Sequence, residues 1–221
     1  MISNLTVWDT YGKLVGLDRT PSEIRRRLQT VRGWGAYLVY LGISDAIARE
    51  LPANQLIALT DLQDGKDYDP IAAQFTFAIS AQDDPRAPAG MRAATVQLFT
   101  DVEDWFTYHE DESDHEEKDT ATFAALWPRL LAAIPELGES SELIETVTPR
   151  TFYENTRRKL GMVGGIGHSP IQSVETGLNA FSHETAIPNL FMVGDTTLPG
   201  AGVAAVSHGA LALANQLTGR R

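Results

Sequence analysis

The 221-residue sequence has no cysteine. This absence excludes disulfide bonds, thiolate catalysis and every zinc or iron–sulfur site built on cysteine. The sequence also has no apolar run near the roughly 18 residues that a membrane-spanning helix needs. At the N-terminus no basic segment precedes an apolar one, so we expect no signal peptide and a cytoplasmic location. Apolar residues make up 43% of the chain, which is typical of a globular protein that folds on its own core.

Positive charge is scarce as well. The 18 lysines and arginines are outnumbered by 29 aspartates and glutamates, which gives a net charge of −11. This balance argues against nucleic acid, or an anionic membrane surface, as a general partner. The excess negative charge is concentrated in residues 51–120, which carry 16 acidic and four basic groups. Both ends of the chain are nearly neutral.

The densest acidic run, residues 101–119, contains His109 and His115. These histidines do not have the i, i+4 spacing of a helical ligand pair, and no third ligand is specified. We therefore expect no metal site, and interpret the run as a solvated loop or helix face.

Apolar and polar residues alternate over 74–80 and 93–100, which predicts two strands joined as a hairpin by the turn-rich segment 83–90. Further strands are predicted at 5–8, 34–43 and 143–147. Helices are predicted after an N-cap at Thr20, over 120–134 with a kink or a restart at Pro128, and over 148–161. Strands paired locally with helices between them predict an α+β fold with a mixed, largely antiparallel sheet.

The segment 189–206 carries the clearest chemical signal. Leu190–Val193 is a short apolar run typical of a strand buried on both faces, and Gly194 lets the backbone turn or approach a ligand closely. Asp195 follows at the C-terminal end of that strand, where open α/β sheets bind ligands. A helix with one apolar stripe is predicted next. Its preceding loop contains Pro199, Gly200 and Gly202, and its stripe consists of Val203, Val206, Ala210, Leu213 and Leu217.

The predicted start of this helix suits an electron-rich ligand. Helix N-termini offer unpaired N–H groups and about half a positive charge, and residues 203–206 include no acidic side chain that would occupy this field. A phosphate, or the N1–C2=O edge of a flavin, would fit there. Asp195 would repel a phosphate but would accept hydrogen bonds from the hydroxyls of a ribityl or ribose chain. On spacing alone, an ordinary strand–turn–helix with glycines at tight corners explains the pattern equally well.

Residues 190–206 resemble the C-terminal flavin-contacting motif of the family of phytoene desaturases, carotenoid isomerases and retinol saturases. Segments 4–9, 84–90 and 148–152 resemble other parts of that family in the same order, so the resemblance covers nearly the whole chain. It implies an FAD-dependent oxidoreductase that acts on an extended apolar substrate, typically a polyene. Peripheral contact with a membrane stays open, because a polyene must come from a bilayer although no basic amphipathic anchor is visible.

The resemblance also implies roles for individual residues. Asp195 would contact the ribityl chain of FAD, with Gly194 beside it. Gly202, Val203 and Ala204 would present backbone N–H groups to the isoalloxazine edge. Such groups would stabilise the negative charge that a flavin gains on reduction.

The resemblance divides the chain at residue 185. Residues 1–185 would form a substrate-domain-like α+β region, and residues 186–221 would supply the last strand and helix of a Rossmann-like FAD domain. Family members begin with a strand and a G-x-G-x-x-G segment that binds the FAD pyrophosphate, and none precedes a helix here. The chain thus resembles a C-terminal half, which should bind FAD weakly or not at all alone. We expect a split-gene subunit or fragment whose partner chain supplies the GxGxxG half.

The remaining candidate residues do not point to one specific function. The glycine-rich cluster Gly161–His168 is either a loop that approaches the flavin or substrate, or a structural turn. His183 and His208 complete no triad pattern, and His208 is interpreted as a packed or capping residue. Residues 157–159 would close a helix, where cations favour the C-terminal end of the dipole. No catalytic residue is identified.

Two functions besides the flavoenzyme stay open. The chain could be a non-catalytic protein that keeps the apolar pocket and carries a lipophilic pigment, or a fragment without activity.

Overall fold

The computed structural model describes residues 1–60, 69–82, 84–85, 87–106, 112–138, 141–167 and 180–219. The chain divides into two units, which we describe separately: unit 1 comprises Met1–Gly35 and Phe152–Arg221, and unit 2 comprises Ala36–Thr151. Neither border coincides with the predicted division at residue 185. Residues 186–221 share unit 1 with residues from the N-terminus because β7 pairs with β1.

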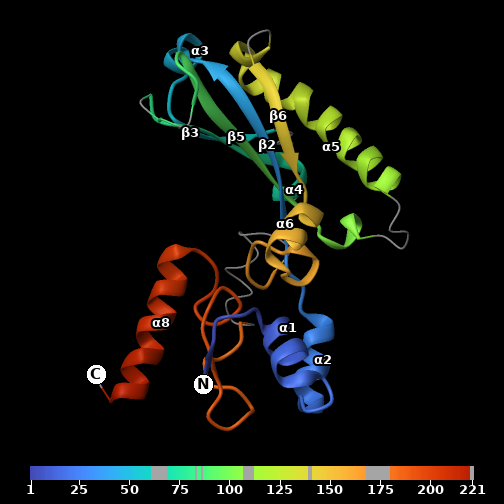
Figure 1. Cartoon of the computed structure of the whole chain (residues 1–221), viewed down its shortest axis with the longest axis vertical. Helices are drawn as coiled ribbons and strands as arrows, with labels where there is room; N and C mark the ends of the chain where they lie inside the picture. Colours follow the sequence, from blue (N-terminus) through green and yellow to red (C-terminus); the bar gives the residue numbers. More distant parts are fainter. Residues whose placement is uncertain are drawn as a thin grey trace. The chain divides into compact units, whose positions relative to one another are not determined.

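Unit 2 is built on a five-stranded sheet with the order β3-β4-β5-β2-β6 (Figure 1). The pairs β3–β4, β4–β5 and β2–β6 are antiparallel, which confirms the predicted hairpin and the α+β fold class. The strands are β2 (Gly35–Ser44), β3 (Gln55–Leu59), β4 (Gln74–Ile79), β5 (Met91–Thr100) and β6 (Ser141–Val147).

The core of unit 2 lies between one face of this sheet and helix α5 (Glu112–Ala133). Period-2 alternation sends every second side chain of β4 and β5 to that face, where Phe75, Phe77, Val96 and Leu98 are buried. Two short elements, α3 (Asp45–Glu50) and η3 (Pro135–Leu137), add residues to the same cluster.

Helix α5 is longer than predicted. It begins at Glu112, inside the acidic run, and continues through Pro128 to Ala133 without a restart. Proline removes one backbone hydrogen bond from a helix. Leu126 and Leu130 on either side of it are buried in the core, so tertiary packing supports the helix through the position where the sequence predicted a kink or a restart.

A polar network ties α5 to the sheet. The Tyr37 hydroxyl donates to Asp119 Oδ1 at 2.5 Å, and the Thr146 hydroxyl donates to Asp119 Oδ2 at 2.6 Å. Trp105 stacks on Tyr37 with ring centroids 5.6 Å apart. Burial, reinforced by the Asp119 carboxylate, raises the pKa of Tyr37 well above its ordinary value.

Replacing Tyr37 by phenylalanine should therefore change how stability depends on pH. Above about pH 10 an unfolded tyrosine loses its proton, whereas Tyr37 keeps its own in the folded chain, so wild-type stability falls as pH rises. Tyr37→Phe should cost about 1–2 kcal/mol near neutral pH, through the lost hydrogen bond to a carboxylate, and should lessen the alkaline fall. Urea unfolding at about pH 8 and about pH 11 measures both effects. An alkaline fall as steep as that of wild type would contradict the assignment.

Unit 1 contains a two-stranded parallel sheet in which β1 (Ile2–Ser3) pairs with β7 (Phe191–Met192). Its helical elements are α1 (Val7–Asp9), the π-helix η1 (Thr10–Gly16), α2 (Ser22–Thr30), α6 (Pro149–Thr156, which spans the border with unit 2), the 3₁₀-helix η4 (Lys159–Gly161) and α8 (Val203–Thr218). Two further short elements, α4 (Pro70–Ala73) and η2 (Glu103–Trp105), belong to unit 2.

Three predictions about unit 1 are wrong. Residues 5–8 are not a strand, because the Thr6 hydroxyl accepts from Asp9 N at 3.1 Å and caps α1. Thr20 does not cap α2; its hydroxyl donates instead to the carbonyls of Tyr11 and Gly16. Helix α6 ends at Thr156 and not at residue 161, because the next residue adopts a φ of 57°.

None of the helices within the described ranges is long and apolar enough to cross a membrane.

Candidate functional site

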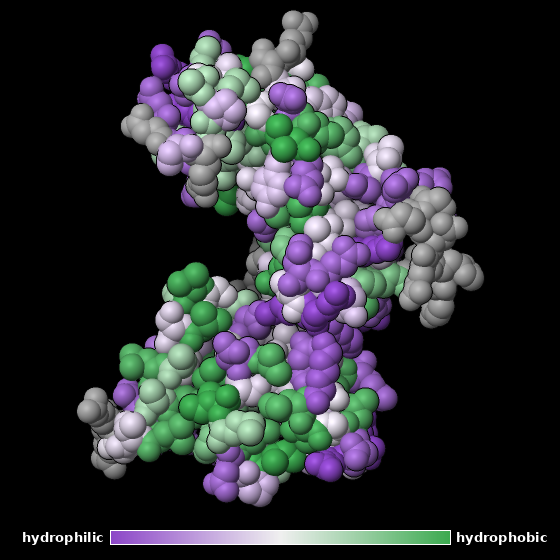
Figure 2. Space-filling model, in the orientation of Figure 1, coloured by the Kyte–Doolittle hydropathy of each residue, from purple (hydrophilic) through white to green (hydrophobic). Residues whose placement is uncertain are grey.

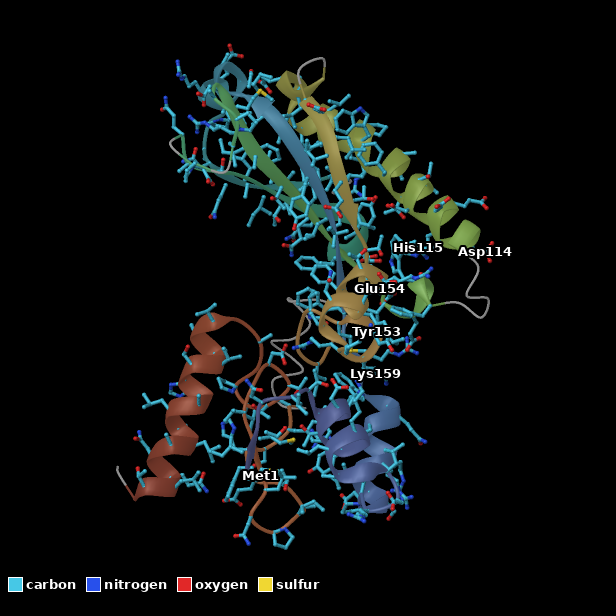
Figure 3. The ribbon with its side chains drawn as sticks, in the orientation of Figure 1. Met1, Asp114, His115, Tyr153, Glu154 and Lys159 are labelled. Carbon is cyan, nitrogen blue, oxygen red and sulfur yellow. The ribbon has the colours of Figure 1, made fainter. Side chains whose placement is uncertain are left out.

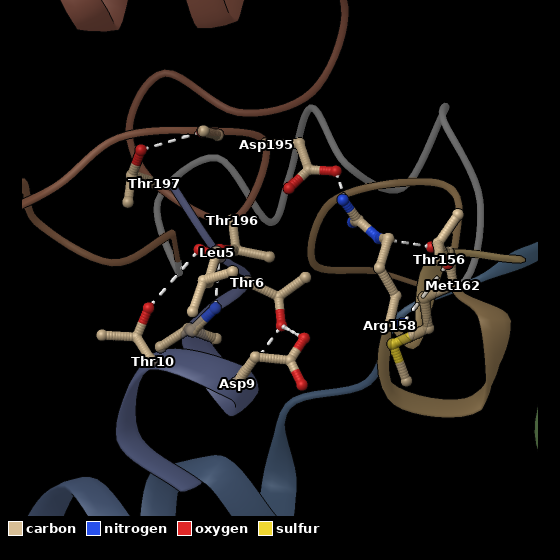
Figure 4. A network of polar contacts seen from close by, with 12 residues as sticks. Leu5, Thr6, Asp9, Thr10, Thr156, Arg158, Met162, Asp195, Thr196 and Thr197 are labelled. Carbon is tan, nitrogen blue, oxygen red and sulfur yellow. Dashed lines mark hydrogen bonds and ion pairs between the residues drawn. The ribbon is translucent and has the colours of Figure 1, made fainter. Parts of the chain in front are cut away.

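The candidate site of unit 1 forms where segments far apart in the sequence meet (Figure 4). Val193 N donates to the carbonyl of Ser3 at 2.9 Å, and Val7 N donates to the Thr196 hydroxyl at 3.0 Å across 189 positions. The segment after β7 is thereby fixed against the first residues of the chain. The strand prediction for Leu190–Val193 is only partly correct, since β7 covers two of its residues and Phe191 is half-buried.

A tight turn follows β7. Gly194 has a φ of 132°, a backbone conformation that favours glycine. Both the backbone N–H and the hydroxyl of Thr197 donate to the Gly194 carbonyl, at 3.2 and 2.8 Å. These bonds close the turn on Asp195 and hold its carboxylate on a rigid support.

Asp195 makes an ion pair with Arg158. Arg158 Nη2 lies 2.6 Å from Asp195 Oδ2, and the two side chains are 29% and 21% exposed, respectively. Arg158 Nε donates to the carbonyl of Met162 at 2.8 Å. Within the described part of the chain, no partner is defined for the other carboxylate oxygen, Oδ1. Asp195 Oδ1 can thus still accept a hydrogen bond from a ligand hydroxyl.

The described part of the glycine cluster, residues 161–167, lies against this turn. It pairs with the chain at Gly33 and Trp34, through a bridge from Gly33 to Ile166 and a 3.2 Å bond from Val163 N to the Trp34 carbonyl. A Cβ at Gly165 would collide with the backbone carbonyl of Asp195. The cluster therefore has a structural role in packing, and it reaches the predicted cofactor segment; His168 lies outside the described residues.

The N-terminus of α8 has no side-chain cap. Gly202 stands at the N-cap with a φ of 99°, and the helical bonds begin with Val206 N donating to Gly202 O at 2.9 Å. The N–H groups of Val203 and Ala204 therefore have no partner within the helix. A Cβ at Gly200 or Gly202 would meet nothing within 4 Å, so there is open space around this end. These donors, together with the free oxygen of Asp195, fit the acceptor edge and the hydroxyls of a flavin.

Helix α8 begins at Val203, as predicted, but most of its apolar stripe is not buried. Only Leu213 of the five stripe residues is buried, with Gly209 beside it. A Cβ at Gly209 would lie 2.7 Å from the Leu198 carbonyl, so α8 packs through a glycine, which a count of apolar residues does not reveal. Val203, at the start of the stripe, is 84% exposed.

Among the described residues, the histidines form no triad with a serine and a carboxylate. His183 Nδ1 donates to the carbonyl of Met192 at 2.9 Å. His208 is exposed, so of the two predicted roles, packed or capping, the packed one is wrong. In unit 2, His115 lies near the start of α5 (Figure 3) within 3.3 Å of the Thr148 hydroxyl. His109 lies outside the described residues.

Sequence reasoning missed two features of the site. Arg158 was assigned to a helix end, and its pairing with Asp195, 37 positions away, has no local signal. The spacing Gly200-x-Gly202-x-x-Ala205 also matches the alanine-ended form of the dinucleotide fingerprint. A loop separates it from β7, whereas in the fingerprint the glycines follow the strand directly.

The fold is similar to that of a protein whose structure has been solved. It matches the crystal structure of an oxidoreductase from Methanosarcina mazei with a TM-score of 0.62 and 14% identity, covering 97% of this chain and 42% of that one. At this identity the likeness concerns the fold, and it agrees with the α+β architecture described above. No family model matches the chain.

The chain is also similar in sequence to two curated plant proteins. The chain is 28% identical over 221 residues to a chloroplastic prolycopene isomerase of Daucus carota, covering 98% of this chain and 35% of the relative. The corresponding enzyme of Arabidopsis thaliana is 26% identical, with 98% and 36% covered. The predicted resemblance to the carotenoid isomerase and phytoene desaturase family is thus confirmed. The chain spans about a third of the length of these relatives, less than the half predicted.

Proposed function

We propose that the chain is part of an FAD-dependent oxidoreductase of the desaturase, isomerase or saturase type, acting on an extended apolar polyene. One observation carries the proposal: the turn at Asp195 and the uncapped start of α8 occur in a chain that resembles prolycopene isomerases over 98% of its length. The predicted cytoplasmic location, with peripheral contact to a membrane, belongs to this proposal.

The cofactor would be held by residues that already fit it. Asp195 Oδ1 would accept a ribityl hydroxyl, and the N–H groups of Val203 and Ala204 would donate to the electron-rich edge of the ring. Gly194 and Gly202 permit these approaches through their positive φ angles. When bound, FAD would supply the redox chemistry of the reaction, while the N–H groups would favour negative charge on the ring.

Helix α8 supports the proposal of a partner chain. It has no Asp, Glu, Lys or Arg among its 16 residues, and helices without a charged face are normally buried. Yet Val203, Ala210, Ala214 and Leu217, which share one face by helical spacing, are all exposed. Figure 2 shows hydrophobic residues gathered along this helix. We propose that this face packs against a dinucleotide fold, carrying G-x-G-x-x-G, that lies outside these 221 residues.

The sheet of unit 2 supports an apolar substrate. Ile57 and Leu59 of β3 lie opposite Thr76 and Gln74 of β4, on the face away from the core, and Ile57 is 68% exposed. A Cβ at Gly42 would lie 3.7 Å from Ile144 Cδ1, and Ile144 is 62% exposed. Exposed branched apolar side chains suit a long hydrocarbon better than a polar metabolite. On the β6 side of the sheet, Glu142 and Glu145 lie opposite Gly42 and Tyr40 of β2, so the apolar surface is bordered by two carboxylates there.

Co-expression with a chain that carries a G-x-G-x-x-G segment and is encoded nearby tests the proposal. The purified complex should be yellow, with flavin absorbance near one FAD per complex, and should convert added prolycopene in detergent micelles. A complex that never takes up added FAD would refute the flavoenzyme. A complex with bound polyene, no flavin and no conversion would instead favour the non-catalytic carrier.

A variant of α8 tests the proposed docking face, and a variant of α5 serves as its matched control. Leu211, 60% exposed, flanks the proposed docking face, and Leu211→Glu should prevent co-purification of the partner chain. Ala125→Glu, which adds the same charge at an exposed position of α5, should leave co-purification intact.

A further inference from the structure

Arg158 is held at two points of its guanidinium group. Nη2 donates to Asp195 Oδ2 at 2.6 Å and Nε donates to the carbonyl of Met162 at 2.8 Å (Figure 4). The planar group cannot rotate without losing one of these bonds. The side chain of Asp195 is thereby fixed from the side of Oδ2.

The backbone that carries Arg158 is an unusual turn. Arg157 and Leu160 on either side adopt φ angles of 57° and 51°, a left-handed backbone conformation that is unfavourable for residues other than glycine. The turn is held by Arg157 N donating to the Tyr153 carbonyl at 2.7 Å and by Lys13 Nζ donating to the Arg157 carbonyl at 2.7 Å. Such conformations persist where the surrounding structure over-determines them, and here the outcome is a fixed position for Arg158.

Lys159, the residue after Arg158, makes a different contact. Lys159 Nζ lies over the ring of Trp8, 5.3 Å from its centroid, and Lys159 is labelled in Figure 3. Of these two adjacent side chains, Arg158 therefore meets the carboxylate at the candidate site while Lys159 covers an aromatic ring.

We propose that Arg158 is a positioning residue of the cofactor site. It holds Asp195 through Oδ2 so that Oδ1 faces a ribityl hydroxyl, and its charge balances the carboxylate beside a ring that gains negative charge on reduction. A carboxylate without this counter-ion would disfavour the reduced cofactor by direct repulsion. The inference rests on the proposed FAD site and assigns to this chain a residue that sets both the affinity and the reduction potential of the cofactor.

Two measurements on the complex with the partner chain test the role of Arg158: the dissociation constant of FAD and the midpoint potential of the bound flavin. In Arg158→Gln we expect about tenfold weaker binding, the equivalent of one weakened hydrogen bond, and a more negative potential. Arg158→Lys should recover most of both, because it restores the charge. The double variant Asp195→Asn, Arg158→Gln should return the potential toward wild type, because both charges are absent.

Arg157→Gln is the matched control, since it removes one positive charge from the adjacent, exposed position of the same turn. Affinity and potential of Arg158→Gln that equal those of wild type or of Arg157→Gln would overturn this inference and leave the FAD site itself in place. A double variant whose potential stays as negative as that of Arg158→Gln would also overturn it, because a purely structural defect would not respond to charge balance. A wild-type complex that binds no FAD would overturn both proposals.

Discussion

Asp195→Ala is expected to weaken FAD binding by the assembled complex about 10- to 100-fold, the equivalent of one hydrogen bond to a charged acceptor. The carboxylate stands on a turn that Thr197 closes with two bonds to the Gly194 carbonyl, so removing it should not unfold the support. Titration of the flavin-free complex with FAD, followed by flavin fluorescence, measures the change.

A carboxylate elsewhere in unit 1 provides the comparison for this result. Glu184 is exposed and hydrogen-bonds the side chain of Gln216 in α8. Glu184→Ala should bind FAD as wild type does. Equal affinities for Asp195→Ala and Glu184→Ala would remove Asp195 from the cofactor site, provided that circular dichroism shows both variants folded.

Phe77→Ala should destabilise unit 2 by about 3–5 kcal/mol, the usual cost of deleting a buried phenylalanine side chain. Phe77 has no exposed surface and lies in the core between the sheet and α5. The cost combines lost apolar burial with the cavity that remains. Urea unfolding of the whole chain, followed by far-ultraviolet circular dichroism, should show an earlier transition for the part of the signal that unit 2 contributes.

Thr76→Ala tests whether burial is the cause. Thr76 is adjacent on the same strand but points to the opposite, half-exposed face, so its loss should change stability by less than about 0.5 kcal/mol. A cost below about 1 kcal/mol for Phe77→Ala would show that the core has no well-packed site at this position.

The predictions that succeeded depend on short-range periodicity. The hairpin of β4 and β5 follows from residues that alternate at positions two apart, and the observed pairing of Phe77 with Val96 places both on the core face, as expected. The α+β class follows from the same local patterns. The positive φ of Gly194 was likewise predictable, because a glycine directly after an apolar strand is a common solution for a sharp turn.

The predictions that failed depend on competition between local and tertiary effects. Residues 5–8 have the composition of a strand, yet the Thr6 side chain caps a helix there. Helix α5 passes through Pro128 because buried leucines on both sides support it. In α8 the packed side contains Gly209, where the absence of a side chain permits close contact, together with Leu213, while Val203, Ala210 and Leu217 of the apolar stripe are exposed.

By itself, the sequence determined what chemistry is excluded, since a chain without cysteine forms no disulfide or cysteine-based metal site. It also determined the local elements and the resemblance to carotenoid isomerases, because both reside in contiguous residues. Only the tertiary structure decided that Arg158 neutralises Asp195, that Gly165 lies against its carbonyl, and that Val7 bonds Thr196 across 189 positions. Those contacts join segments whose separation along the chain carries no periodic signal, so packing and hydrogen bonding between distant elements select them.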